Sequence, residues 1–274
     1  MAKIIIDSNT NRIFPNWKEL FHYKDLFWTL SWRDFRVRYA QTSIGFLWAI
    51  IQPVLTIAIL TIVFGRFVGV ETQVPHLVYT VAGMSLWTYF SYVMTNSGGS
   101  IIASQQMVKK IYFPRLIIPL SKAVVGLIDL FITLLLLVIL LFYYQIPITW
   151  NILYAPLFIA MSMLAALSVG IWLSALTVRF RDFQHVVPFM VQIGLYITPI
   201  AYPIEMVSAN APSWLKSIYF MNPMAGIIEG FRWSIFGGRL DWSIIGLAAI
   251  IVLVLFTTSL IYFRKVEDEM ADYV

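Results

Sequence analysis

Six long apolar stretches divide this sequence, and they constrain its fold more than any other feature. A helix needs about 20 mostly apolar residues to cross the hydrocarbon core of a bilayer. The fifth stretch is short and contains Pro188 and Pro199, so it is the weakest of the six. The sequence predicts an all-α membrane protein with six transmembrane helices, at residues 44–67, 77–95, 117–144, 152–178, 186–202 and 243–263.

The amino-acid composition favours lipid as the solvent. Of the 274 residues, 60% are hydrophobic and 12% are charged. Charged residues make up about 25% of an average soluble domain, so this chain has too few charges to coat a surface in water. The sequence has no cysteine, which excludes disulfides and thiolate nucleophiles. Its three histidines are far apart, so we expect no metal site and no catalytic residue.

The distribution of Lys and Arg predicts the orientation of the chain. If the N-terminus lies inside the cell, the inner segments hold fifteen of the 19 Lys and Arg residues. Basic residues concentrate on the cytoplasmic side of membrane proteins, so we expect both termini in the cytoplasm and no binding of nucleic acid. The predicted parts are a cytoplasmic N-terminus at 1–43, a six-helix transmembrane domain at 44–263 and a cytoplasmic C-terminal tail at 264–274.

The segment before the first stretch predicts an amphipathic helix that lies in the membrane interface. Aromatic and apolar residues recur at roughly helical spacing from residue 17 onward, with charged residues on the other faces. Arg33, Arg36 and Arg38 then cluster just before the membrane. This cluster suits a topology anchor, and it also suits a clamp for an anionic lipid headgroup or a pyrophosphate.

Residues 203–241 are too apolar for an ordinary loop and too interrupted to span a bilayer. One short helix is expected at 213–220. Asn222-Pro223 is a typical start for a second, because it combines an N-cap residue with proline at the first helical position. We expect both helices to be re-entrant, dipping into the outer leaflet where protein or water must surround their non-helical ends.

Asp129 lies within the third apolar stretch. A carboxylate at the bilayer centre costs about 2.5–3.5 kcal/mol on insertion scales, so this side chain should face protein or water. A proton-coupled carrier would use such a group, but carriers of that kind usually have several intramembrane charges. We expect instead a structural hydrogen bond, either to Thr133 one turn further along or to a neighbouring helix.

A short surface helix is expected between the second and third apolar stretches, at residues 101–111. Glycines break the preceding helix, and Pro114 stops this one. The segment suits either a plain basic connector or a coupling helix that docks on a nucleotide-binding partner. The residues that would make the coupling contact are Gln105, Lys109 and Lys110.

The connector at 179–185 is a compact charged turn that contains Arg179, Arg181 and Asp182. It suits either an ion pair within the chain or a second docking contact. The sequence has no G-x-x-x-x-G-K-[ST] run, so it has no phosphate-binding P-loop. If transport uses ATP, another chain must hydrolyse it. We therefore expect no cofactor in this chain, with ATP and magnesium bound to the partner.

Aromatic residues make up 16% of the chain. Aromatic belts at the lipid interface explain many of them. A subset that faced a channel could stack against sugar rings, which present apolar C–H faces. The candidates for such a lining are Trp87, Tyr89, Tyr92 and Tyr196.

Three local patterns carry a resemblance to a known family. They are residues 32–48 with Gln52-Pro53, residues 110–115 with 119–121, and residues 179–183 with 198–203 and Asn222-Pro223. In these patterns the chain resembles the polysaccharide-export permeases of the ABC-2 type, which include O-antigen, capsule and teichoic-acid exporters. The resemblance extends over roughly residues 32–232, but it does not distinguish among these substrates.

The resemblance implies a homodimer around a continuous channel in the bacterial cytoplasmic (inner) membrane, with each copy paired to a separate ATPase subunit. It implies that 101–111 and 179–185 are coupling regions and that the short helices after the fifth span form an extracytoplasmic gate. The cargo would be a long glycan on polyprenyl pyrophosphate. The arginine cluster would then lie near a lateral opening that admits the lipid.

Two other functions stay open at this point. A permease of the same architecture could export a small hydrophobic drug or lipid, although the aromatic content and the arginine cluster favour a glycan. A membrane-embedded glycosyltransferase or polymerase would need convergent carboxylates or a nucleotide-sugar site in a sizeable loop. The sequence has neither feature.

Overall fold

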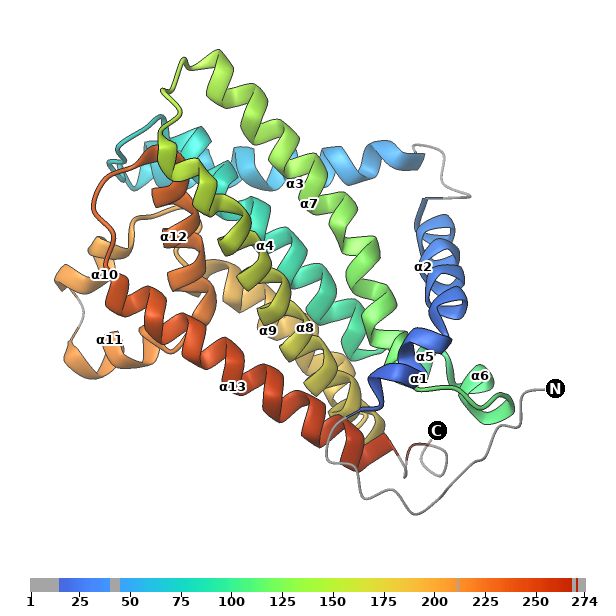
Figure 1. The fold of residues 1–274 in the computed structure, drawn as a ribbon. Helices are drawn as coiled ribbons and strands as arrows, with labels where there is room; N and C mark the ends of the chain where they lie inside the picture. The colour runs from blue at the N-terminus through green and yellow to red at the C-terminus, as the bar shows by residue number, and fades with distance from the viewer. Residues whose placement is uncertain (1–14, 40–44, 211, 268–269, 271–274) are drawn as a thin grey trace.

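The computed structural model describes residues 15–39, 45–210, 212–267 and 270, and every regular element in those ranges is a helix (Figure 1). The predicted all-α fold is therefore confirmed for these residues. Four long helices form the body of the molecule and run roughly alongside one another: α4 (His76–Gly98), α7 (Ile117–Tyr143), α8 (Ala155–Arg179) and α13 (Trp242–Glu267).

Helix α4 lies at the centre of the bundle, where it packs against α7 and α8 and buries most of its side chains. Glycines on the neighbouring helices allow this close approach. A Cβ added at Gly126 would lie 2.9 Å from the Tyr92 ring, and one at Gly170 would lie 2.9 Å from Ser97. Small and polar residues are typical of such helix–helix contacts within membranes. Because protein surrounds α4, the helix can carry Thr, Ser and Tyr residues.

Four helical segments are long and apolar enough to cross a membrane. They correspond to the first, third, fourth and sixth predicted stretches. The second stretch lies in α4, which has 23 residues but is not among these four. The fifth lies in α9, whose 15 residues extend about 22 Å and so fall short of a hydrocarbon core about 30 Å thick. The four segments are Gly45–Phe67, Ile117–Tyr143, Trp150–Arg179 and Trp242–Glu267.

The first of these segments is a continuous helical path with three geometries. It begins as the 3-10 turn η1 (Gly45–Leu47), continues as α3 (Trp48–Leu60) and ends as the π-helix η2 (Thr61–Phe67). Figure 1 shows this path lying across α7 instead of running along it. Most of its apolar side chains are exposed, so lipid or another chain has to cover them.

The fifth predicted stretch is wrong at both ends. Helix α9 (Phe183–Ile197) begins three residues before the predicted start at Val186. It ends before Thr198-Pro199, because the residue that precedes a proline is disfavoured in helical geometry.

The fourth predicted stretch begins two residues too late. A 3-10 turn, η3 (Trp150–Tyr154), extends α8 at its start beyond the prediction.

Three short helices follow α9, where two were predicted. They are α10 (Ile204–Asn210), α11 (Ser213–Phe220) and α12 (Pro223–Phe236). The predicted start of α12 is confirmed, because the Asn222 side chain accepts a hydrogen bond from the Met224 N–H at 3.1 Å. Whether these helices dip into the outer leaflet stays a prediction.

Two predicted interfacial helices are each divided in the structure. The N-terminal one forms α1 (Trp17–His22) and α2 (Lys24–Tyr39), and the one at 101–111 forms α5 (Ser100–Ala103) and α6 (Gln105–Lys110). Parts of the predicted N-terminus, of the first pattern and of the C-terminal tail lie outside the described residues, at 1–14, 40–44, 268–269 and 271–274.

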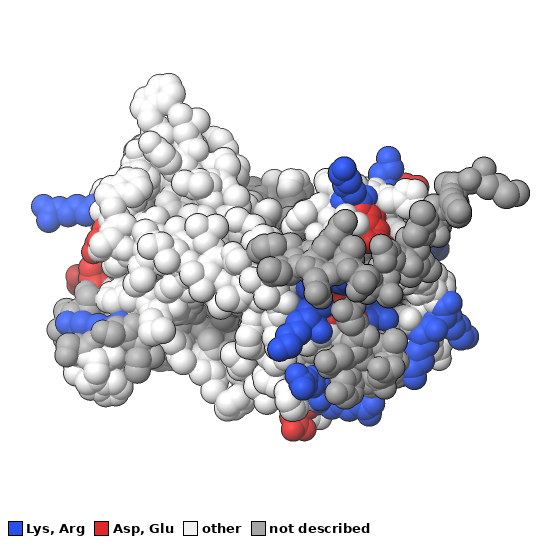
Figure 2. Space-filling view, turned by 60° about the horizontal axis from the view of Figure 1, so that its bottom comes forward, with Lys and Arg blue, Asp and Glu red and all other residues white. Residues whose placement is uncertain are grey.

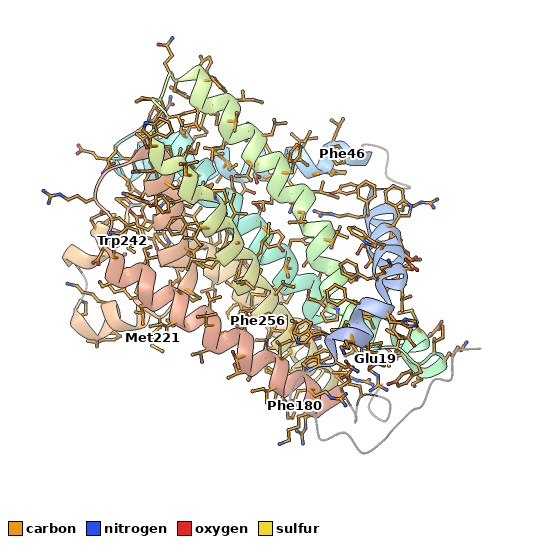
Figure 3. All side chains as sticks on the ribbon, viewed as in Figure 1. Glu19, Phe46, Phe180, Met221, Trp242 and Phe256 are labelled. Atoms are coloured by element: carbon orange, nitrogen blue, oxygen red, sulfur yellow. The ribbon has the colours of Figure 1, made fainter. Side chains whose placement is uncertain are left out.

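The charged side chains gather at the two ends of the bundle. One end, called the basic end below, carries α1, α5, α6 and the last turns of α13, and the opposite end, called the far end, carries α10, α11 and α12. Figure 2 shows Lys and Arg gathered over the basic end, a broad uncharged surface in the middle and a few charges at the far end. Figure 3 places Glu19 and Phe180 at the basic end and Trp242 at the far end.

Candidate functional site

The two short helices at the basic end have a buried face and an exposed face. Ile101 and Val108 are buried in a hydrophobic cluster that also includes residues of α2, α8 and α13. Gln105, Lys109 and Lys110 are exposed. This arrangement holds α5 and α6 against the bundle by their apolar side chains, while the three predicted coupling residues stay accessible to a partner.

The segment after α6 ties the basic end together. The Tyr112 hydroxyl donates a hydrogen bond to Glu19 Oε1 of α1 at 3.1 Å, and the Arg115 backbone N–H donates to Glu267 Oε1 of α13 at 3.0 Å. The Arg115 guanidinium also donates to the Glu267 carbonyl. Phe113, between them, is buried. Burial, and next the Glu19 carboxylate, raise the pKa of the Tyr112 phenol, so Tyr112 stays a hydrogen-bond donor at neutral pH.

The second basic connector is an exposed turn between α8 and α9 at the same end. Arg179, Arg181 and Asp182 are all exposed. Of the two interpretations of this turn, the ion pair is wrong, because the structure has no salt bridge from Asp182 to either arginine in this fully described turn. The arginines are therefore accessible. Their docking role stays a prediction.

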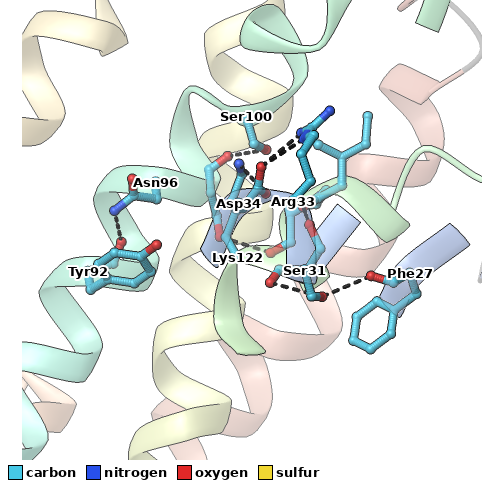
Figure 4. Close-up of polar contacts among 12 residues, drawn as sticks. Phe27, Ser31, Arg33, Asp34, Tyr92, Asn96, Ser100 and Lys122 are labelled. Carbon is cyan, nitrogen blue, oxygen red and sulfur yellow. Dashed lines mark hydrogen bonds and ion pairs between the residues drawn. The ribbon is translucent and has the colours of Figure 1, made fainter. Parts of the chain in front are cut away.

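Helix α2 is held on α7 by two ion pairs, which we call the α2–α7 seam. Arg38 Nη2 lies 2.8 Å from Asp129 Oδ2, and Lys122 Nζ lies 2.6 Å from Asp34 Oδ2. Figure 4 shows the second pair, with Ser31 beside it. The Arg38 guanidinium also lies 4.4 Å from the centre of the Tyr92 ring, a favourable cation–π geometry.

This seam accounts for the intramembrane carboxylate. Asp129 was expected to bond Thr133 or a neighbouring helix. The Thr133 hydroxyl donates to the backbone carbonyl of Asp129 at 2.8 Å, whereas the carboxylate bonds Arg38 and lies 3.5 Å from the Tyr39 hydroxyl. The neighbouring helix is therefore the correct alternative, and the partner is a charge. Sequence reasoning missed this pairing, although a lone intramembrane carboxylate and a nearby arginine cluster were both visible.

The three arginines of the predicted lipid clamp have different surroundings. Arg38 is bound to Asp129, and Arg33 bonds the adjacent Asp34 at 2.9 Å. Arg36 is exposed and forms no ion pair within the described part of the chain. Arg33 is exposed as well, so what distinguishes Arg36 is that it is exposed and has no carboxylate partner among the described residues.

At the far end, one buried arginine anchors the helices that follow α9. Arg232 is 2% exposed, and it donates hydrogen bonds to the carbonyls of Pro199, Ile200 and Tyr79. A Cβ added at Gly83 of α4 would lie 2.6 Å from Arg232 Nη2, so the glycine makes room for the guanidinium. Sequence reasoning counted Arg232 only as an outer charge. The missed signal is that Glu229 and Arg232 lie one turn apart in an otherwise apolar helix.

The four aromatic candidates for a channel lining fall into two groups. Trp87 and Tyr89 are 5% and 2% exposed, because α7, α8, α9 and α12 pack around α4. Tyr92 is half-buried beside Arg38, and Tyr196 on α9 is 58% exposed. A channel lining needs an accessible ring, so the geometry favours the second group.

A family model described as ABC-2 type transporter matches residues 25–236, which is more than three quarters of the chain. The chain belongs to the ABC-2 type transporter family. In this ABC-2 chain the matched region includes the α2–α7 seam, both basic connectors and Arg232. The bond between Arg115 and Glu267 reaches outside the region, because Glu267 lies beyond it.

Relatives of this ABC-2 chain are similar along nearly their whole length. The O-antigen export system permease protein RfbA of Klebsiella pneumoniae is 29% identical over 253 residues, 90% of this chain and 94% of that protein. RfbA of Myxococcus xanthus is 26% identical over 255 residues, covering 92% and 96%. The polysialic acid transport protein KpsM of Escherichia coli is 24% identical over 246 residues, covering 87% and 92%.

No group of three or more His, Cys, Asp or Glu side chains among the described residues could hold a metal ion. The chemistry that this ABC-2 chain presents is therefore of two kinds. It has accessible basic side chains on small helices at one end. At the other end it has charges and aromatic rings around a pocket.

Proposed function

We propose that this chain is the permease subunit of an ABC transporter that exports a lipid-linked polysaccharide, such as O-antigen, across the bacterial cytoplasmic membrane. The observation that carries the proposal is its similarity, over 87–92% of its length, to permease and transport proteins named for O-antigen and polysialic acid. The family match supports the same assignment, because ABC-2 membrane subunits are not themselves catalytic.

In the proposed transporter the chain crosses the membrane six times. Helix α4 adds the second crossing to the four segments that are long and apolar enough on their own, and α9, which is shorter than the hydrocarbon core, adds the fifth together with the chain that follows it. A second copy covers part of the exposed apolar surface, which gives a homodimer around the export path. The basic end faces the cytoplasm, because basic residues favour that side.

Two separate ATPase subunits supply the energy, and they carry ATP and magnesium. The exposed faces of α6 and of the 179–182 turn support this part of the proposal, because both lie at the basic end and are accessible. The bonds from Tyr112 to Glu19 and from Arg115 to Glu267 give a docked partner a mechanical connection to α1 and α13.

The lipid pyrophosphate of the cargo would meet Arg36 first. Arg33 and Arg36 are both exposed, but Arg33 contacts Asp34 and Arg38 contacts Asp129, whereas Arg36 has no carboxylate partner among the described residues. A phosphate group is attracted to an accessible guanidinium near the membrane surface. Along the export path, Tyr92 and Tyr196 are the rings best placed to stack on sugars, because each keeps an accessible edge or face.

Reversing the charges on α6 tests the coupling. In cells that lack the chromosomal copy of this gene, we expect the Lys109→Glu/Lys110→Glu variant to abolish surface glycan, because it would repel an acidic docking surface. The matched control is Lys18→Glu/Lys24→Glu, which reverses two exposed charges at the same end and should retain export. Immunoblots of surface glycan and of membrane-inserted permease provide the measurement.

Deleting the gene tests the function itself. If surface polysaccharide is unchanged in the deletion strain, the chain does not export it, and a small hydrophobic cargo becomes the better proposal. If the deletion removes surface polysaccharide but the α6 variant restores it fully, the export function is supported. The assignment of α6 as the coupling site is then wrong.

A further inference from the structure

A pocket of about 530 Å³ opens at the far end, beside α12. Its walls come from the connection after η2, from the start of α10 and from the last turns of α12 with the glycines that follow. Its volume lies within the range of about 300–1,000 Å³ that is usual for small-molecule sites. The export proposal above assigns no role to this pocket.

The end of α12 shapes the floor of the pocket. Gly237 and Gly238 have φ angles of 76° and 93°, a region that residues with a side chain rarely adopt. This turn reverses the chain immediately after Phe236, so the last turn of α12 stays open on the pocket side. A Cβ added at Gly238 would lie 3.2 Å from Gln73 Oε1, which also lines the pocket.

The charges around the pocket sum to −1 when all are ionised, because three carboxylates outnumber two guanidiniums. These residues are Glu71, Glu205, Glu229, Arg232 and Arg239. A carboxylate-bearing ligand would approach three like charges, and such contacts are unfavourable at short range. The pocket therefore carries charges of both signs without a positive excess, so its charge balance does not favour an acidic ligand.

Two buried polar atoms in the pocket wall have no hydrogen-bond partner among the described residues. They are Glu229 Oε2 and Arg232 Nε. Arg232 is 2% exposed and uses its other two nitrogens to bond backbone carbonyls. A buried polar atom without a partner is costly, so a polar group that bonded either atom would stabilise this wall of the pocket. Hydroxyl groups match both atoms in kind, because a hydroxyl donates to a carboxylate and accepts from a guanidinium.

Aromatic rings supply the apolar side of the pocket. Tyr79, Trp233 and Phe236 all line it. Trp233 is held by Tyr154 and Trp242, whose ring centres lie 5.5 Å and 5.7 Å away. Rings of this kind pack against the apolar C–H faces of a sugar, while carboxylates and guanidiniums bond its hydroxyls.

We propose that this pocket binds one or two neutral sugar units of the exported glycan as it leaves the membrane. The proposal rests on the export function inferred above. It adds to that function a class of substrate, neutral sugars, and a binding location. Polar groups of both signs bond the sugar hydroxyls, the aromatic rings contact the sugar face, and the charge balance does not favour acidic sugars.

The absence of cysteine allows a direct test on the purified full-length chain in lipid nanodiscs. A single Thr72→Cys change places a unique thiol in the pocket wall. A polar maleimide then reports access to the pocket. The probes are neutral tetrasaccharides of mannose, galactose, glucose or rhamnose, and acidic tetrasaccharides of galacturonic or sialic acid, each at millimolar concentration.

We expect at least one neutral tetrasaccharide to slow labelling of the Thr72→Cys variant threefold or more, and the acidic ones to have no effect. A thiol at Ile148→Cys, which is exposed and outside the pocket lining, is the matched control and should label at the same rate with or without sugar. Adding Glu229→Gln, which keeps the side-chain shape, should remove most of the protection.

Three results would overturn the proposal: no protection by any neutral sugar, equal protection by acidic sugars, or protection that survives Glu229→Gln unchanged. The export test in cells separates this failure from failure of the proposed function. If gene deletion removes surface glycan and the pocket stays unprotected, only the sugar site is wrong. If deletion leaves surface glycan unchanged, the export function itself is wrong.

Discussion

One carboxylate, Asp129, shows how a buried charge helps to join two helices. The Asp129 side chain is mostly buried on α7, and the Arg38 guanidinium of α2 bonds it at 2.8 Å. Tyr39 and Tyr92 surround the pair. Two charges that are removed from water together stabilise each other, whereas one of them alone does not. Removing one member of the pair should therefore destabilise the protein more than replacing both members with apolar residues.

Removing one member of this pair should destabilise the protein more than replacing both. Asp129→Asn leaves the Arg38 charge without a carboxylate, and Arg38→Met leaves Asp129 alone. Breaking a buried pair costs about 3–5 kcal/mol, and partial exposure of Arg38 places the expected loss at the lower end. The Arg38→Met/Asp129→Leu double variant should recover most of that loss.

Thermal unfolding of the purified variants in one detergent measures these losses. A double variant as unstable as the sum of the two single variants would show that the residues act independently, and the Arg38–Asp129 pair would then not help to hold α2 on α7.

Among whole elements, α13 and α9 differ in how they begin. Asp241 Oδ1 accepts hydrogen bonds from the Ser243 backbone N–H at 2.9 Å and from the Ser243 hydroxyl, at the first turn of α13. Asp182 occupies the corresponding position before α9, but its side chain caps nothing. An aspartate therefore caps the start of α13 but not the start of α9. The two aspartates can be compared directly by the same substitution.

We expect Asp241→Ala to lower the free energy of unfolding by about 1 kcal/mol, the usual value for a lost N-cap, and Asp182→Ala to change it little. The hydrogen bonds from Ser243 lower the pKa of the Asp241 carboxyl below its ordinary value of 3.8. The stabilisation from Asp241 is therefore complete above pH 3.8 and declines as the pH falls through the lower, folded-state pKa.

Unfolding at a series of pH values should show a constant difference between wild type and Asp241→Ala at neutral pH, which shrinks in strong acid. A difference that grows on acidification would contradict the capping role.

Over the whole molecule, the bundle separates rings that stabilise the fold from rings that a substrate could reach. Helix α4 is enclosed by α7, α8, α9 and α12, so Trp87 lies inside the protein. A Cβ added at Gly194 of α9 would lie 2.7 Å from the Trp87 ring, which shows how closely the two helices pack there. Tyr196, two residues further along α9, is exposed.

Replacing Trp87 or Tyr196 with alanine should therefore affect different properties of the protein. Trp87→Ala opens a cavity between α4 and α9 and should lower the free energy of unfolding by about 3–5 kcal/mol. Tyr196→Ala should leave stability nearly unchanged and slow glycan export, if its ring contacts the moving chain. Unfolding experiments and surface glycan per inserted permease separate the two effects. Native stability of Trp87→Ala combined with slow export would instead place Trp87 on the export path.

Much of this architecture could be predicted from local chemistry. Apolar runs of sufficient length located four spans, because lipid accepts only such helices. Asn222-Pro223 located the start of α12, and the positions of the two basic connectors between long helices were also visible in the sequence. These features depend on neighbours in sequence, so they are visible before any tertiary contact is known.

Contacts between distant residues could not be predicted in this way. Nothing near Asp129 in sequence indicates that Arg38, 91 positions away, is its partner. Nothing near Arg232 indicates that the carbonyls of Pro199 and Tyr79 surround its guanidinium. The pocket beside α12 likewise combines four separate segments.

Hydrophobic pattern, helix caps and prolines act over a few residues, and they largely set which parts of this chain are helical and apolar. The partners of the buried charges, and the rings that face inward, depend on which helices pack together. That packing decides which side chains lose contact with solvent, and loss of solvent is what makes a charge require a partner.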